Sequence, residues 1–298
     1  MFEKKKVDRR KAALQKEWNL VTAQEKKMIL AAVDMEKKQS GKVTNWKYNL
    51  EQKIPHKVYD NLRAAFGKAF LLIFEKGDVI IEKTYNKETI LKDFAIRDYA
   101  VEVKGSRKEL KEVRKKSGTA DLANMALSTV EGIGLGVLGI GLPDIVIFIG
   151  VLLKGIYEAA LNYGYDYDRP EEKLLMLKMM ETALLTGDDW IHANKEVDDW
   201  IRDGVPQLRK PDTASEQSGS PKYSGCSQEA GMTLAIREQI RKTADIFALD
   251  MLLLKFIQGM PVVGIIGGAT NPVYYNKVMK YVRLKYQKRY LLKKMGDS

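Results

Sequence analysis

The sequence predicts an all-α protein, a multi-helix bundle with a central glycine-rich apolar helical hairpin. Two observations predict this fold class. Apolar residues recur at helical spacing over most of the 298 residues, and residues typical of helix starts precede these runs. One segment alone, residues 78–85, has the composition of a β-strand, and no second segment offers it a partner. A bundle of helices is therefore expected.

The first two predicted helices follow from capping signals. Thr22 and Glu25 have the spacing of a capping box, which predicts a helix start there and an apolar-periodic run that ends before Gly41. Pro55 suits the first turn of a second helix, whose apolar spacing continues to about Phe74.

The next helices are predicted in the same way. Asn86 and Ser106 are expected N-caps, and Glu109 stands three residues after Ser106 as in a capping box. A further helix is expected from about residue 120 into the glycine-rich region. After it, Pro143 is expected to restart the helix.

Clear stop signals divide the second half of the chain. The helix from Pro143 is expected to end at Gly164. Pro170, followed by two glutamates that favour the positive end of the helix dipole, begins another that ends near Gly187. A short helix is expected over residues 189–202.

Residues 204–230 contain little apolar character and are predicted to form one long flexible loop. Two last helices are expected at about 232–258 and 273–294, the second capped by Asn271 with Pro272 in its first turn. We interpret residues 1–50 as N-terminal helices and residues 51–298 as one helical domain that contains the flexible loop.

The most apolar stretch, residues 132–153, just reaches the length of about 20 residues that a membrane-spanning helix needs. Against a simple span, Asp144 stands near its middle beside Pro143, and a carboxylate at that depth is costly. Both a membrane-dipping hairpin and a soluble core stay open, and the polarity of the whole chain favours the core. Asp144 and Glu131 are candidate buried or functional acids, although Asp144 in a first turn also stabilises the helix dipole without any chemistry.

A second, shorter apolar segment covers residues 256–269 and is too short to span a membrane alone. Small residues stand four apart in both apolar segments, at Gly132 and Gly136 and again at Gly264 and Gly268. This spacing allows two helix backbones to approach closely. The four glycines are therefore predicted helix-packing positions. Gly132 and Gly136 belong to the hairpin, whose arms are expected at about residues 120–141 and 143–163, and the face with Gly264 and Gly268 is expected to pack against it.

The composition indicates a soluble, basic protein without disulfide bonds within the chain. The mean hydropathy is −0.30 and 30% of the residues are charged, values typical of a soluble protein, and the formal net charge is +11. Basic blocks at both ends flank an acidic middle, and residues 1–130 alone hold 29 basic and 18 acidic residues. The single cysteine, Cys226, excludes an intrachain disulfide and fits a reducing compartment. It is expected to be an inert thiol in the polar loop.

The last predicted helix has a pattern that suggests an anionic partner. Tyrosines interleave with basic residues, and no acid occurs between Asp250 and Asp297. Tyrosine favours the membrane interface and lysine an anionic surface, although a core helix with a solvated basic face gives the same pattern. No helix-turn-helix, zinc-finger or RNA-recognition signature is present, so nucleic acid is not the expected partner. The candidate membrane or anion contacts are Lys277, Lys280, Arg283, Lys285, Lys288 and Arg289.

Catalytic signatures are missing. The sequence has no phosphate-loop motif, GxSxG elbow or HExxH pair, and the glycine run follows no strand. The weak candidate for a metal site is Asp188, His192 and Glu196, which share one helix face at a spacing of four. Such a cluster is more often an exposed ion-pair site, so no metal or cofactor is expected.

Several of these residues resemble the EcsC protein family. They are Gly141-Leu-Pro-Asp144, Tyr163-Gly-Tyr-Asp166 with the following Pro170-Glu-Glu, and the closing 261–271 segment with the basic last helix. The likeness extends from about residue 50 onwards. It implies a bacterial helical protein of the cytoplasm or the cytoplasmic membrane, and it carries over no catalytic residue. The family's name comes from a bacterial locus that also encodes an ABC transporter, which makes such a transporter an implied partner.

We therefore expect a non-enzymatic protein that associates with the cytoplasmic membrane face or with a membrane-protein partner. The alternative is a cytosolic enzyme or small-ligand-binding protein that uses Asp144 or the Asp188 and His192 site.

Overall fold

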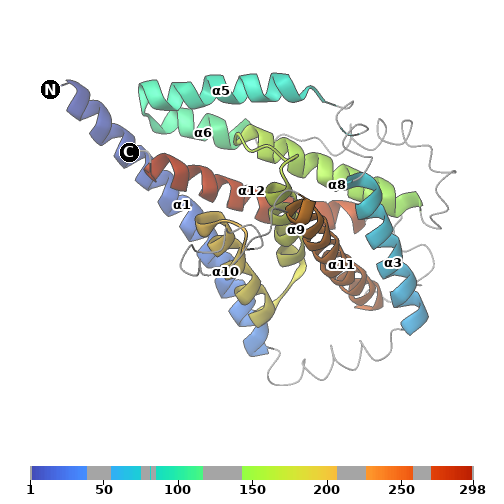
Figure 1. Cartoon of the computed structure of the whole chain (residues 1–298). Helices are drawn as coiled ribbons and strands as arrows, with labels where there is room; N and C mark the ends of the chain where they lie inside the picture. Colours follow the sequence, from blue (N-terminus) through green and yellow to red (C-terminus); the bar gives the residue numbers. More distant parts are fainter. Residues whose placement is uncertain are drawn as a thin grey trace, which may run out of the picture.

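The computed structural model describes residues 2–38, 55–74, 81, 85–116, 143–206, 226–257 and 270–296. In these residues the secondary structure is helical and contains no strand, which confirms the predicted all-α class. The nine helices of these ranges are α1 (Phe2–Lys38), α3 (His56–Leu72), α5 (Lys87–Lys104), α6 (Arg107–Lys116), α8 (Pro143–Asn162), α9 (Pro170–Leu184), α10 (Gly187–Asp203), α11 (Cys226–Ile257) and α12 (Thr270–Gly296) (Figure 1).

Helix α12 is the central element of the fold. It contacts α1, α8, α9 and α10, so the last helix of the chain packs against the first (Figure 1). All five of its tyrosines are buried: Tyr274, Tyr275, Tyr281, Tyr286 and Tyr290. The interleaved tyrosines therefore mark the core face of α12. Of the two interpretations of that pattern, this burial agrees with the core helix and not with a membrane-interface belt.

Two aromatic clusters fill the core. Phe247 of α11 lies 5.4 Å from Phe66 and 5.7 Å from Phe70 of α3, between ring centroids, and 6.3 Å from Phe148 of α8. Tyr163, at the end of α8, lies 5.9 Å from Tyr290 of α12, between ring centroids. These contacts join helices that are far apart in sequence.

Helix α8 includes the most apolar described segment. Residues 145–162 have a mean hydropathy of 1.7 and are the one described window that is long and apolar enough to cross a membrane. Yet 89% of that window is buried inside the protein, between α3, α5 and α12. The burial of α8 supports the soluble-core interpretation of this segment.

Several predicted helix ends are confirmed. Asn86 accepts a hydrogen bond from the Thr89 backbone N–H at 2.9 Å, and Pro55 immediately precedes α3. Helix α8 ends in a Schellman motif, in which the Tyr165 N–H donates to the Ala160 carbonyl and the Gly164 N–H to the Leu161 carbonyl, both at 2.9 Å. Gly164 has a φ of +79°, which explains the glycine there.

Other predicted boundaries are wrong. Helix α1 begins at Phe2, so Thr22 lies inside it and its hydroxyl donates to the Trp18 carbonyl at 3.0 Å. No glycine or proline interrupts residues 2–38, which is why one helix forms. Helix α11 begins at Cys226, inside the predicted loop. Helix α12 begins at Thr270, so Asn271 and Pro272 are already helical.

Helix α1 shares the hydrophobic core with the later helices through buried residues that include Leu14 and Val21. The domain boundary near residue 50 falls among residues outside the described part and stays a prediction. The predicted helix from about residue 120, the glycine hairpin's first arm and most of residues 78–85 also lie outside it.

Candidate functional site

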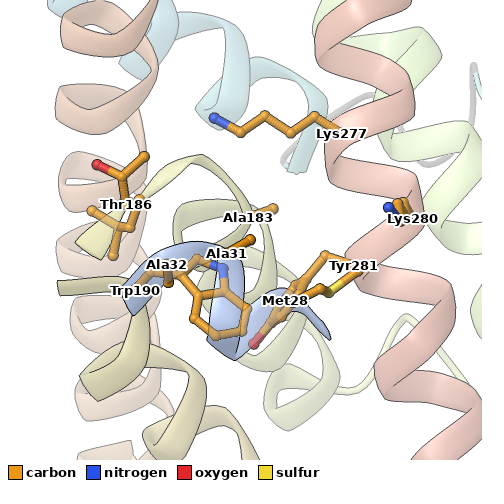
Figure 2. Close-up of a pocket in the computed structure, with 10 residues that line it drawn as sticks. Met28, Ala31, Ala32, Ala183, Thr186, Trp190, Lys277, Lys280 and Tyr281 are labelled. Atoms are coloured by element: carbon orange, nitrogen blue, oxygen red, sulfur yellow. The ribbon is translucent and has the colours of Figure 1, made fainter. Parts of the chain in front are cut away.

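A pocket of about 240 Å³ opens between α1 and α12 (Figure 2). Its walls combine small and apolar side chains from α1, α9, α10 and the short α9–α10 connection, and they leave room because four of the lining residues are alanine or threonine. The lining residues are Met28, Ala31, Ala32, Ala183, Leu185, Thr186, Trp190, Lys277, Lys280 and Tyr281. None of them is an aspartate, glutamate, histidine or cysteine, and the titratable side chains of the lining are Lys277, Lys280 and Tyr281.

The two lysines of this pocket differ in their partners. Lys277 donates to the Leu184 carbonyl at 3.3 Å, and its Nζ lies 3.7 Å from a carboxylate oxygen of Asp250. Figure 2 shows Lys277 extending away from α12 above Ala183. Lys280 is exposed, and in the described ranges no carboxylate oxygen lies within 4 Å of its Nζ. Lys280 is thus a cation available to a ligand.

Tyr281 and Trp190 form the aromatic wall of the pocket, with ring centroids 6.0 Å apart. The Tyr281 hydroxyl donates to Oδ1 of Asn194 at 2.9 Å. Burial raises the pKa of Tyr281 well above its ordinary value, and the charges of Asp198 and Glu25 raise it further. Tyr281 therefore stays a neutral donor at physiological pH and fixes the wall's geometry.

A second, more polar cavity of about 410 Å³ lies along the same two helices. Its lining residues are Gln24, Arg114, Tyr163, Asn276, Lys280, Arg283, Leu284 and Gln287. Lys280 lines both cavities, so the apolar pocket and the polar cavity adjoin at this residue. Arg283 is partly buried, and its Nε has no hydrogen-bond partner among the described residues.

A buried ion-pair cluster fixes α1 and α10 against α12. Lys285, whose side chain is 0% exposed, contacts Glu25 of α1 and lies 2.6 Å from Asp198 of α10. Lys288 lies 2.5 Å from Glu25 and 2.8 Å from Asp198. Two cations and two carboxylates thus neutralise each other inside the protein.

Arg289 is also engaged internally. Its guanidinium lies 2.7 Å from Glu172 of α9 and 3.8 Å from the centroid of the Tyr165 ring, and the Tyr286 hydroxyl donates to the same glutamate at 2.7 Å. The prediction that Lys285, Lys288 and Arg289 contact an anionic surface is therefore wrong. Of the six predicted contacts, Lys280 and Arg283 remain placed to meet a ligand, while Lys277 is largely engaged.

The cluster predicts a pH dependence of stability. Burial alone would raise the pKa of Glu25, yet the charge of Lys285 and hydrogen bonds from Lys285 and Lys288 lower it from 4.5 to about 2. Since the folded-state pKa lies below the unfolded value, Glu25 stabilises the fold above pH 4.5 and loses this contribution as the pH falls toward 2. The loss is about 3 kcal/mol of unfolding free energy.

Urea denaturation at pH 7 and pH 3 measures this effect. Glu25→Gln is the matched control, because it removes the titrating group and keeps the side-chain shape. We expect a smaller difference between the two pH values in Glu25→Gln than in the unaltered protein; equal differences would contradict the assignment to Glu25.

The remaining predicted site residues are not brought together. Asp188, His192 and Glu196 lie on the exposed face of α10, and Glu196 pairs with Lys178 of α9 at 2.7 Å. Across the described ranges, no three His, Cys, Asp or Glu side chains are grouped to hold a metal ion. Asp144 is the second residue of α8, and its side chain lies outside the described part. The other sequence candidates outside it are Glu131, Gly132, Gly136, Gly264 and Gly268.

Sequence reasoning missed the pocket residues Met28, Ala31 and Trp190. No local motif marks them, because the pocket forms only where segments about 250 residues apart meet. One sequence feature points to the pocket: the adjacent small residues Ala31 and Ala32 leave space on α1 opposite the lysines of α12.

Comparison with protein families agrees with the motifs of the sequence. The model of the EcsC protein family matches residues 15–291 of the 298. The chain belongs to the EcsC family. The match includes most of α1, further toward the N-terminus than the resemblance in sequence indicated. Searches of curated proteins and of solved structures gave no match to this EcsC protein.

Proposed function

We propose that this EcsC protein is a non-catalytic protein that binds the anionic cytoplasmic face of a membrane. The observation that carries the proposal is the outer face of α5, where three large apolar side chains point to solvent. Ile96 is 68% exposed, Tyr99 70% and Val103 42%. Their spacing of three and four places them on one helix face. Large apolar side chains clustered on an exposed helix face are typical of an interaction surface.

Two acidic residues of α5, Asp98 and Glu102, point the other way. Asp98 accepts from the Tyr290 hydroxyl at 2.8 Å and lies 2.8 Å from Lys294 of α12. Glu102 lies 2.6 Å from both Lys294 and Arg10. These two carboxylates are neutralised at the inner face of α5. The exposed face of residues 96–103 is apolar with a tyrosine, a composition that suits the lipid interface, while the exposed Glu88 nearer the start of α5 pairs with Lys92.

Two basic segments contact α5. Helix α6, which packs against α5, contains six basic and two acidic residues. Residues 2–11 of α1, which reach α5 through the Arg10–Glu102 pair, also contain six basic and two acidic residues. Each basic residue near an anionic membrane contributes about 1 kcal/mol. Apolar and electrostatic attraction thus act at the same end of the molecule (Figure 1).

The test is co-sedimentation with vesicles of phosphatidylglycerol and phosphatidylcholine. We expect binding that needs phosphatidylglycerol and weakens with salt. The double change Ile96→Glu/Tyr99→Glu is expected to reduce binding at least tenfold, because it removes apolar contacts that contribute about 1.4 kcal/mol or more and adds negative charge.

Leu234→Glu is the matched control, since Leu234 of α11 is also 68% exposed and lies on another helix. It should bind like the unaltered protein. Unchanged binding by the α5 variant would reject this surface. Binding to native membranes but not to lipid vesicles would instead support a membrane-protein partner such as an ABC transporter.

A further inference from the structure

The apolar pocket and the polar cavity share Lys280 as a lining residue, and we call the two together the α1/α12 groove. Its apolar part contains Met28, Ala31 and Trp190, and its polar part contains Arg283 and three side-chain amides. The amides belong to Gln24, Asn276 and Gln287. Lys280 stands where the two parts adjoin. A molecule that consists of an apolar chain with an anionic end has a matching apolar part and a matching polar part.

We propose that the α1/α12 groove binds one molecule of a single-chain lipid with a phosphate headgroup, with the acyl chain in the pocket and the phosphate beside Lys280 and Arg283. This goes beyond the proposed membrane association, because it concerns one lipid molecule held in a groove rather than the contact of α5 with a bilayer. The two rest on different residues and can fail independently.

The size of the pocket fits part of an acyl chain. One water takes up roughly 30 Å³ in the liquid and a methylene group is of similar size, so 240 Å³ holds about eight methylene groups. The walls next to that space are methyl, thioether and indole groups, which favour an apolar chain. A second acyl chain would not fit in the same volume.

The polar part fits a phosphate. Lys280 has no carboxylate partner within 4 Å among the described residues, and Arg283 carries a buried Nε without a hydrogen-bond partner there. Arg114 also lines the cavity, oriented by Glu17. A guanidinium prefers the oxygens of a phosphate, and the three amide side chains supply further donors. Glu158 influences Arg283 electrostatically and reduces, without cancelling, the positive charge of this part.

The experiment is isothermal titration calorimetry of the full chain with decyl phosphate below its micelle concentration. Three comparison probes separate the parts of the ligand: decanol has the chain without the charge, inorganic phosphate has the charge without the chain, and decanoate replaces phosphate by carboxylate. We expect saturable one-to-one binding of decyl phosphate, at least tenfold weaker binding of decanoate and decanol, and no binding of inorganic phosphate.

Two variants test the groove. Lys280→Met removes the cation where the two parts of the groove adjoin. It should weaken the binding of decyl phosphate at least fivefold and leave the affinity for decanol unchanged. Ala31→Leu fills the pocket from an exposed position of α1, so it should fold normally and should weaken both ligands. The matched controls are Lys293→Met and Ala12→Leu, at exposed positions on the same two helices that line neither cavity.

Equal affinities for decanol and decyl phosphate, or full affinity in Ala31→Leu, would overturn the proposal. Loss of titration in Ile96→Glu/Tyr99→Glu would also overturn it, since that variant alters α5 alone. Conversely, saturable decyl phosphate binding by a variant that no longer binds vesicles would support the groove even if the α5 proposal fails.

Discussion

Replacing Lys285 by methionine is expected to lower the free energy of unfolding by about 3 to 5 kcal/mol. The substitution leaves Glu25, which is buried, with Lys288 as its remaining cation, and Asp198 must share that cation. The cost comes from the uncompensated buried charge rather than from the loss of a favourable pair. Urea denaturation followed by circular dichroism measures it directly.

Two further variants separate this explanation from simple loss of packing. Adding Glu25→Leu to Lys285→Met removes the uncompensated carboxylate, so the double variant should recover at least half of the lost stability. The variant Lys280→Met replaces an exposed lysine of the same helix. It should change the free energy of unfolding by less than about 0.5 kcal/mol. A double variant less stable than Lys285→Met would contradict the explanation.

Replacing Gly164 by alanine is expected to lower the unfolding free energy by about 3 kcal/mol. Two causes add. The φ of +79° is unfavourable for a residue with a Cβ, at about 1 to 2 kcal/mol. A Cβ there would also lie 2.2 Å from a ring carbon of Phe94, which forces the ring or α5 to move, at about 1 to 3 kcal/mol.

Gly187→Ala is the matched control, because Gly187 has a φ of +62° and nothing lies within 4 Å of its added Cβ. It should cost only the backbone strain. The difference between the two alanine variants in urea denaturation gives the contribution of the Phe94 contact, and equal losses would show that this contact does not matter. Because Phe94 belongs to α5, Gly164→Ala should also weaken vesicle binding more than Gly187→Ala does.

Much of the fold could be predicted because its helix ends are set locally. The cap at Asn86, the proline starts at Pro143 and Pro170, and the glycine stop at Gly164 depend on a few neighbouring residues. The start of α1 could not be predicted in this way. A threonine with a glutamate three residues later has the same spacing at a helix start and inside a helix. Thr22 lies inside α1 because the helix-forming residues before it continue without interruption.

The site could be predicted less well, because charge patterns do not show where the partner of each charge lies. Lys285 and Lys288 have the sequence pattern of an exposed basic face, but their carboxylates belong to α1 and α10. The relevant signal was the five tyrosines of α12, whose large apolar area favours burial. On α5, Ile96, Tyr99 and Val103 have the spacing of a core face, and only the packing shows that this face points to solvent.

The contact between the first and last helices also has a consequence for how the chain is made. Glu25 and Lys285 are separated by 260 positions. At roughly 5 to 20 residues per second, a ribosome needs about 15 to 50 seconds to travel between them. During that interval the nascent α1 has its acidic residue and apolar stripe without the helix that covers them. The native arrangement can therefore be completed only after nearly the whole chain has been synthesised, and early α1 is a candidate client for chaperones.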